Sequence, residues 1–209
     1  MSEPIIVGIT GRMRSGKSTL AHTLGNGSTR VVISFAEYVR REVADSFFGN
    51  WEWPLWKLQE LEAADKGTVR PILQAFGHGK RTLINTDYWV NKLATDVADN
   101  HQDKDIIFID DVRYVNEIEY IMNHGGYIVR LSCDDEILIE RGASADALLH
   151  PSENNIDPDN LTLAESTKPS HVLMLDSGSA DKMQIARWTT RWLQTFDLFR
   201  DISLSPDEE

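Results

Sequence analysis

The sequence predicts an α/β fold built on a parallel, doubly wound sheet of five strands with helices on both faces. Apolar runs of strand length alternate with stretches of helical periodicity, which is the pattern of βαβ units. A glycine-rich turn at residues 11–16 stands between the first apolar run and the first helical stretch. Another apolar run, at residues 106–109, ends in two aspartates, as expected of a strand buried on both faces.

The individual elements follow from this pattern. Strands are predicted at residues 4–10, 30–35, 106–109, 127–131 and 171–176. Helices with both ends defined are predicted over 16–24, 36–48, 57–66, 114–122 and 134–141. Another helix starts at residue 69, and the next one follows a cap at Asn85 or Thr86. The last helix ends at about residue 196. Pro71 fits the first turn of the helix that starts at 69. Ile185, Trp188, Trp192 and Phe196 are expected to form the apolar face of the last helix.

Residues 11–19 form the sequence G-x-x-x-x-G-K-S-T, which binds triphosphates when it joins a strand to a helix. Backbone N–H groups and the positive end of the helix dipole face the phosphate oxygens. Lys17 is expected to reach the β- and γ-phosphates, and the Ser18 hydroxyl to bind Mg²⁺. The predicted nucleotide-binding residues are Gly11, Arg12, Met13, Arg14, Ser15, Gly16, Lys17, Ser18 and Thr19.

Asp110 and Asp111 close the apolar run at 106–109. In a parallel sheet the carboxyl ends of the strands share one edge, so these carboxylates should lie near the phosphate loop. One of them could hold Mg²⁺ or act on an attacking hydroxyl, and the alternative is a pair of turn aspartates that cap the next helix. Phosphoryl transfer also needs cations near the equatorial oxygens, and the candidates are Arg14, Arg113 and Arg141.

Other residues are candidates for binding a second, phosphorylated substrate. Arg40, Arg41 and Arg70 could clamp its phosphate. Residues 142–167 lose all periodicity, and a loop of this length is usually functional or disordered. His150 and Glu153, within it, could contact substrate or stabilise a closed lid. Three tryptophans at 51, 53 and 56 either belong to the core of a small subdomain or line a pocket for a base.

Composition limits the choice of partners. A net charge of −12 argues against binding to extended nucleic acid but allows one small phosphorylated substrate. No apolar run approaches the length of a membrane span, so no membrane partner is expected. The single Cys133 excludes an intrachain disulfide, and the first residues do not form a signal peptide, so a cytoplasmic protein is expected. The aromatic last helix leaves a homodimer open.

Several short sequences occur in the order found in bacteriophage deoxynucleoside monophosphate kinases, which this chain resembles over about residues 4–195. After the phosphate loop come L-Q-A-F-G at 73–77, Y-W-V at 88–90, D-V-R-Y-V-N-E at 111–117 and H-P-S-E at 150–153. The resemblance implies an adenylate-kinase-like, phosphate-loop kinase fold with a flap at about 36–85 and a lid at about 142–168. The whole forms one domain over 1–200, followed by an acidic tail at 201–209.

The resemblance also implies an activity: transfer of the γ-phosphoryl group of ATP, with Mg²⁺, to a deoxynucleoside monophosphate. Arg70, Gln74, Trp89 and Arg113 would then serve the acceptor, and Arg141 would act from the lid hinge. Such lids commonly carry arginines, whereas no Lys or Arg occurs between Gly142 and Thr167, so Arg14 and Arg141 would supply more of the charge. A phage-encoded enzyme would work in the host cytoplasm.

Two other functions compete with this reading. A kinase of modified bases or polynucleotides would share the phosphate loop, although the acidic surface argues against a long DNA substrate. A phosphate-loop ATPase or switch would use Asp110 for the metal and water as acceptor, and the opening V-G-I-T-G at 7–11 is also similar to dephospho-coenzyme A kinases. Formation of ADP that depends on an added monophosphate would distinguish the first function from the last.

Overall fold

The computed structural model describes residues 3–48, 58, 60, 62, 66–149, 153 and 169–199. The predictions for the three tryptophans, for His150, for the rest of the lid beyond residue 149 except Glu153 and for the acidic tail fall outside these residues. The chain divides into two compact units. Residues 33–103 form one, here called the helical unit, and residues 2–32 with 104–209 form the other, here called the sheet unit.

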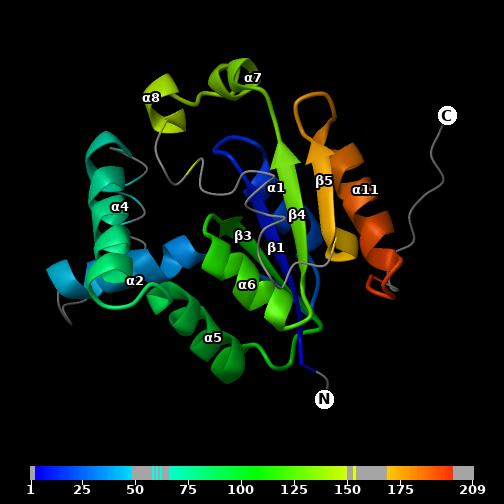
Figure 1. Ribbon diagram of the computed structural model, residues 1–209, viewed down its shortest axis with the longest axis horizontal. Helices are drawn as coiled ribbons and strands as arrows, with labels where there is room; N and C mark the ends of the chain where they lie inside the picture. Colours follow the sequence, from blue (N-terminus) through cyan, green and yellow to red (C-terminus); the bar gives the residue numbers. More distant parts are fainter. Residues whose placement is uncertain are drawn as a thin grey trace. The chain divides into compact units, whose positions relative to one another are not determined.

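The sheet unit contains a five-stranded sheet in the order β2-β3-β1-β4-β5 (Figure 1). β1 (Ile5–Gly11) pairs in parallel with β3 (Ile106–Val112) and β4 (Tyr127–Ser132), and β4 pairs in parallel with β5 (Val172–Asp176). The predicted α/β fold is therefore confirmed. β2 (Arg30–Ile33) is shorter than predicted, because Phe35 already begins the next helix.

Alternation along β1 assigns its side chains to two faces. Val7 and Ile9 belong to a core cluster with residues of α1 (Lys17–Leu24) and α11 (Lys182–Gln194). Between them, Gly8 faces α6 (Val115–Asn123), where an added Cβ would lie 2.6 Å from Ile121. Successive strand residues point to opposite faces, so helices cover both sides of β1, as expected for a doubly wound sheet. Close packing of α6 on β1 fixes where α6 begins, and Arg113 stands two residues before it.

The remaining elements of the sheet unit are short. α7 (Asp135–Glu140) and α8 (Ala145–Leu148) follow β4, and a 3₁₀ turn, η1 (Pro169–His171), precedes β5. The predicted apolar face of α11 is partly wrong: Trp188 is exposed and Phe196 lies beyond the helix end, while Thr189 and Thr190 are buried. The hydroxyl of Thr189 donates to the Ile185 carbonyl within the helix, which satisfies its buried polar group.

The helical unit contains α2 (Phe35–Phe48), α4 (Lys66–Leu83) and α5 (Tyr88–Asn100). α4 starts earlier than predicted, so Pro71 lies inside the helix and cannot donate a hydrogen bond to the carbonyl of residue 67. The predicted cap of α5 is also displaced. Asp87 occupies the cap position, and the Asn85 side chain accepts its N–H at 2.9 Å in the preceding turn. No helix among the described residues is long and apolar enough to cross a membrane.

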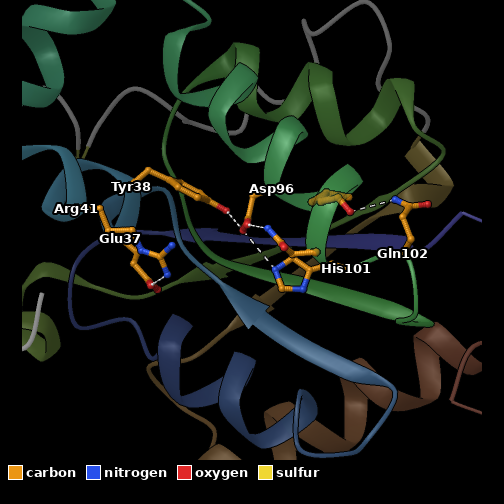
Figure 2. A network of polar contacts seen from close by, with 8 residues as sticks. Glu37, Tyr38, Arg41, Asp96, His101 and Gln102 are labelled. Atoms are coloured by element: carbon orange, nitrogen blue, oxygen red, sulfur yellow. Dashed lines mark hydrogen bonds and ion pairs between the residues drawn. The ribbon is translucent and has the colours of Figure 1, made fainter. Parts of the chain in front are cut away.

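A polar network ties α2 to α5 inside the helical unit (Figure 2). The Tyr38 hydroxyl donates to Asp96 at 2.7 Å, and the His101 ring lies 3.3 Å from the same carboxylate oxygen. Burial and the Asp96 hydrogen bond both raise the pKa of Tyr38. Although burial opposes ionisation of Asp96, the hydrogen bond from Tyr38 helps to hold the pKa of this carboxyl below its ordinary value. The network therefore stabilises the ionised carboxylate.

We expect Tyr38→Phe to lower the free energy of unfolding by about 2 kcal/mol at pH 7, because a hydrogen bond to a charged group is lost. Asp96 has a depressed pKa in the folded state, so its contribution is present above the unfolded pKa of about 4 and is lost as the pH falls further. The difference between wild type and variant, measured by urea unfolding, should therefore shrink below about pH 4. Tyr127→Phe, at a buried tyrosine that packs through its ring on His171, is the control and should lack this pH dependence. A constant difference across the range would contradict the assignment.

Candidate phosphate-binding site

The loop between β1 and α1 has the backbone shape that anion binding requires. Gly11 has φ +139° and Gly16 φ +96°, and a Cβ at Gly11 would lie 2.3 Å from the Leu131 carbonyl oxygen. Only glycine fits these two positions without strain. Arg14 also has a positive φ, of 63°, which costs energy for a residue with a Cβ. The loop therefore places a positively charged side chain, that of Arg14, on a strained backbone position.

Lys17, the first residue of α1, is buried, and its ammonium donates to the Arg12 carbonyl at 2.8 Å. Burial, followed by the positive charge of Arg113, lowers the pKa of Lys17 to about 8. Glu153, Asp111 and Asp110 oppose this change. A phosphate bound at the loop would add negative charge beside the ammonium and would raise the lysine pKa again.

Asp110 lies in the buried last part of β3, which continues through both aspartates to Val112, three residues beyond the predicted end at 109. Its Oδ1 atom has no hydrogen-bond partner among the described residues. Burial and the neighbouring Asp111 raise the pKa of Asp110, while a hydrogen bond from Ser18 lowers it. A buried carboxylate oxygen without a donor is costly unless a cation or a proton satisfies it.

The pairing of Asp110 with the Ser18 hydroxyl fits a hard cation such as Mg²⁺. Mg²⁺ is commonly held by one or two protein oxygens, with water and phosphate oxygens filling the other positions. Among the described residues there is no group of three or more His, Cys, Asp or Glu side chains that could hold a metal ion without such help. The donors that are present therefore suit a cation that arrives with a phosphate ligand.

Arg113 follows β3 and stands before α6, where two glutamates hold it. Its backbone N–H donates to Glu117 at 2.7 Å, and its guanidinium forms an ion pair with Glu153. Although burial opposes it, the Glu153 charge raises the pKa of Arg113. The fixed backbone at residue 113 therefore presents a charged guanidinium at the carboxyl edge of β3.

Glu117 ends the D-V-R-Y-V-N-E sequence at 111–117, but the sequence pattern gave it no role. It is only 1% exposed, and its carboxylate accepts the N–H groups of Arg113 and of Tyr114, the latter at 3.1 Å. This arrangement is the reciprocal half of a capping box, in which a glutamate three residues into the helix binds the cap backbone. The signal was incomplete because Tyr114, rather than serine or threonine, occupies the cap position.

A cavity of about 280 Å³ opens beside the phosphate loop. Its lining joins the loop and α1 to the ends of β4 and β5 and to the first residues of α11; the lining includes Arg14, Gly16, Thr19, Leu131, Arg141, Ser177, Ala180, Lys182 and Ile185. Arg141, at the end of α7, donates to the Ser177 carbonyl at 2.7 Å and so borders the cavity. Two of the predicted cations, Arg14 and Arg141, thus line one hollow, which also has apolar walls.

Arg12 and Met13 contact α7 and α8. Arg12 forms an ion pair with Asp135 and donates to the Leu148 carbonyl at 3.1 Å. Met13 packs against the buried Leu138, Ala143 and Leu148. The side chain of Arg12 therefore anchors α7 and α8, while the backbone of the loop remains the predicted phosphate ligand. Nothing in the sequence pattern pointed to Asp135 as its partner.

The remaining predicted residues lie in the helical unit. Arg40 pairs with Glu62 at 2.8 Å, and Arg41 pairs with Glu37 at 2.5 Å. Arg70 and Gln74 are half-buried on α4. Trp89 is 1% exposed, and its indole N–H donates to the Gly77 carbonyl at 2.9 Å. The structure gives Trp89 a packing position that joins α5 to α4, and the contact with an acceptor that the resemblance implied stays a prediction.

Comparison with known proteins gives one family match, over just under half of the chain. Residues 55–156 match the model of the deoxynucleotide monophosphate kinase family. This match confirms the predicted resemblance, the assignment as a phosphotransferase and the reaction class that the family's name describes. No curated protein sequence matches the chain significantly.

Solved structures confirm the fold alone, because their sequences are distant. A gluconokinase from Sinorhizobium meliloti 1021 is 13% identical with a TM-score of 0.50, and the alignment covers 97% of this chain and 100% of the gluconokinase. The shikimate kinase from Aquifex aeolicus vf5 is 12% identical with a TM-score of 0.50, over 93% of this chain and 99% of the other.

Because burial lowers the pKa of Lys17 to about 8, binding of inorganic tripolyphosphate should weaken as the pH rises. The charged ammonium binds phosphate, so the affinity is fully present below pH 8 and is lost above it. If the bound lysine stays charged, linkage gives a dissociation constant about eightfold larger at pH 9 than at pH 7.5. Titration calorimetry measures this. In Lys17→Arg the guanidinium stays charged, so the only pH dependence left in the affinity should come from ionisation of the tripolyphosphate itself. Equal pH profiles for both proteins would refute the prediction.

Proposed function

Since the central part of the chain, residues 55–156, is that of a deoxynucleotide monophosphate kinase, we propose that the protein transfers the γ-phosphoryl group of ATP to a deoxynucleoside monophosphate, with Mg²⁺, giving the diphosphate and ADP. The acceptor's phosphate oxygen forms a bond to the γ-phosphorus, and the bond to the β,γ-bridging oxygen breaks. The structural observation that best supports this proposal is the buried Lys17 ammonium beside Asp110 and Arg113 at one edge of the sheet.

The donor side of the site is assigned to the sheet unit. Backbone N–H groups of residues 13–18 bind the β- and γ-phosphates, and Lys17 exchanges the Arg12 carbonyl for a phosphate oxygen. The 280 Å³ cavity bordered by Arg14 and Arg141 accepts the base and ribose of ATP. Its apolar walls include Leu131 and Ile185, which suit one face of an aromatic base.

Mg²⁺ would be held by Ser18 and Asp110, and it supplies charge that neutralises the β- and γ-oxygens. This assignment narrows the role of Asp110. A phosphate monoester has its second pKa near 6, so the attacking oxygen of the acceptor is already an anion at neutral pH and needs no general base. A metal-holding role therefore explains the orphaned Oδ1 atom better than proton abstraction does.

Arg70 and Gln74 of α4, in the helical unit, are proposed to bind the acceptor. Arg113, in the sheet unit, is a separate candidate for the same role. Arg40 and Arg41 are weaker candidates for this role, because each already pairs with a glutamate. Trp89 is proposed as a positioning residue, because its indole N–H binds the carbonyl of Gly77, which lies on α4 with Arg70 and Gln74. The flap at 36–85 and the lid at 142–168 remain proposals, as does the cytoplasmic location. A homodimer is likewise an open proposal.

The direct test is a panel of deoxynucleoside monophosphates with Mg-ATP, in which ADP release is coupled to an optical signal. We expect ADP to form only with an accepted monophosphate, because the transfer needs an acceptor oxygen in place of water. A preferred base should emerge from the panel. ADP release at one rate with and without any acceptor would overturn the proposal in favour of an ATPase. Phosphorylation of single-stranded DNA ends, but of no monophosphate, would favour a polynucleotide kinase.

Arg70→Ala should raise the acceptor KM or lower kcat by ten- to a hundredfold while changing the dissociation constant of ATP less than twofold, because the clamp binds only the acceptor. Arg187→Ala, at an exposed arginine of α11, is the matched control and should leave the acceptor KM unchanged. A loss of ATP affinity as large as the loss of acceptor affinity would remove Arg70 from the acceptor site.

A further inference from the structure

The carboxylate of Glu153 occupies the phosphate loop of the sheet unit. Its Oε2 atom accepts the backbone N–H of Met13 at 2.5 Å, and its Oε1 atom accepts from the Arg113 guanidinium. Glu153 belongs to the segment that follows α8, which is about 140 residues from the loop in sequence. The two oxygens of one carboxylate therefore bridge a loop N–H and an arginine, which are the two kinds of donor that bind phosphate oxygens in proteins.

This carboxylate is a buried ion and not a surface contact. The Glu153 side chain is only 2% exposed. Although burial opposes ionisation, Arg113 and the Met13 N–H hold the pKa of Glu153 below its ordinary value. Its charge also acts on Lys17, whose ammonium it helps to keep protonated. Within the described residues, the loop thus already contains an anion in contact with its cationic and N–H donors.

A phosphate and this carboxylate cannot use the same donors at once. Met13 lies in the middle of the loop whose N–H groups would bind the γ-phosphate, and a second anion within about 4 Å would be repelled by several kcal/mol at a protein-surface dielectric. One N–H also has a single hydrogen and cannot donate fully to two acceptors. Binding of a terminal phosphate at Met13 therefore requires that Glu153 leave.

We propose that Glu153 is an internal stand-in for the transferred phosphoryl group, which bridges the Met13 N–H and the Arg113 guanidinium and is displaced when a terminal phosphate binds. Arg113 exchanges a carboxylate for a phosphate in this step, so its charge is never left unpaired. The proposal rests on the proposed function only in taking the loop as the phosphate site.

Displacement has a measurable cost, because phosphate affinity is reduced by the strength of the internal contact. Glu153→Gln keeps the shape of the side chain and removes its charge. We expect inorganic tripolyphosphate to bind this variant about tenfold more tightly than wild type in titration calorimetry at pH 7, since a hydrogen bond to a charged group is worth about that much. The unliganded variant should also unfold at a lower temperature, because Arg113 loses its buried partner.

Two further variants sharpen the result. Glu136→Gln removes the same charge from an exposed position on α7 and should leave the affinity unchanged. Glu153→Asp keeps the charge but is too short to bridge Met13 and Arg113 together, so its affinity should lie between those of wild type and Glu153→Gln. It also decides the matter if Glu153→Gln does not fold.

Unchanged or weaker tripolyphosphate binding in both Glu153 variants would overturn the proposal, and would make Glu153 a residue that supports Arg113 in the occupied site. The readout is independent of kinase activity. Tighter binding in a protein that phosphorylates no monophosphate would uphold the stand-in and reject the proposed function. If the Glu153 variants bind tripolyphosphate no more tightly than wild type, and the protein phosphorylates a monophosphate, the stand-in is rejected and the proposed function is upheld.

Discussion

The burial of charge at the carboxyl edge of β1 and β3 is the constraint on which the rest of the sheet unit depends. Lys17 is a buried cation and Arg113 a partly buried one, and Asp110, Glu117 and Glu153 are buried carboxylates near them. Removing any one partner would leave an uncompensated ion, which is far more costly than a lost surface pair. The apolar parts of β1 and β3 can pack tightly only because these charges balance one another at the ends of the strands.

The sequence was most informative where chemistry forces a local pattern. The phosphate loop could be predicted because its glycines must take positive φ angles between a strand and a helix. The aspartates could be placed because they follow four apolar residues of a doubly buried strand, although that strand continues through them to Val112. The order of short sequences from residue 73 to 153 also predicted the resemblance to the family whose model matches residues 55–156. All of these features depend on the spacing of residues along the chain, which can be read directly from the sequence.

The contacts between distant residues could not be predicted. Nothing in the chain links Glu153 to Met13 or Asp135 to Arg12, because both pairs depend on how α7 and α8 pack on the loop. The acceptor role of Trp89 came from the family resemblance alone and stays a prediction, whereas its spacing with Leu93 and Val97 predicts a buried helix face, which the structure shows. Element ends failed for a similar reason: Phe35 fits a strand by composition and a helix by its packing.

Pro71 has a mechanical consequence for α4. A proline inside a helix leaves one carbonyl without its usual donor and crowds the preceding turn, so bending there breaks no backbone hydrogen bond that exists in the straight helix. The residue immediately before a proline is also the one whose helical conformation is least favoured. In this chain that residue is Arg70. The side chain proposed to bind the acceptor thus lies on the turn of α4 that bends most easily. A change in helix curvature there would change the direction of the guanidinium at little cost in backbone energy.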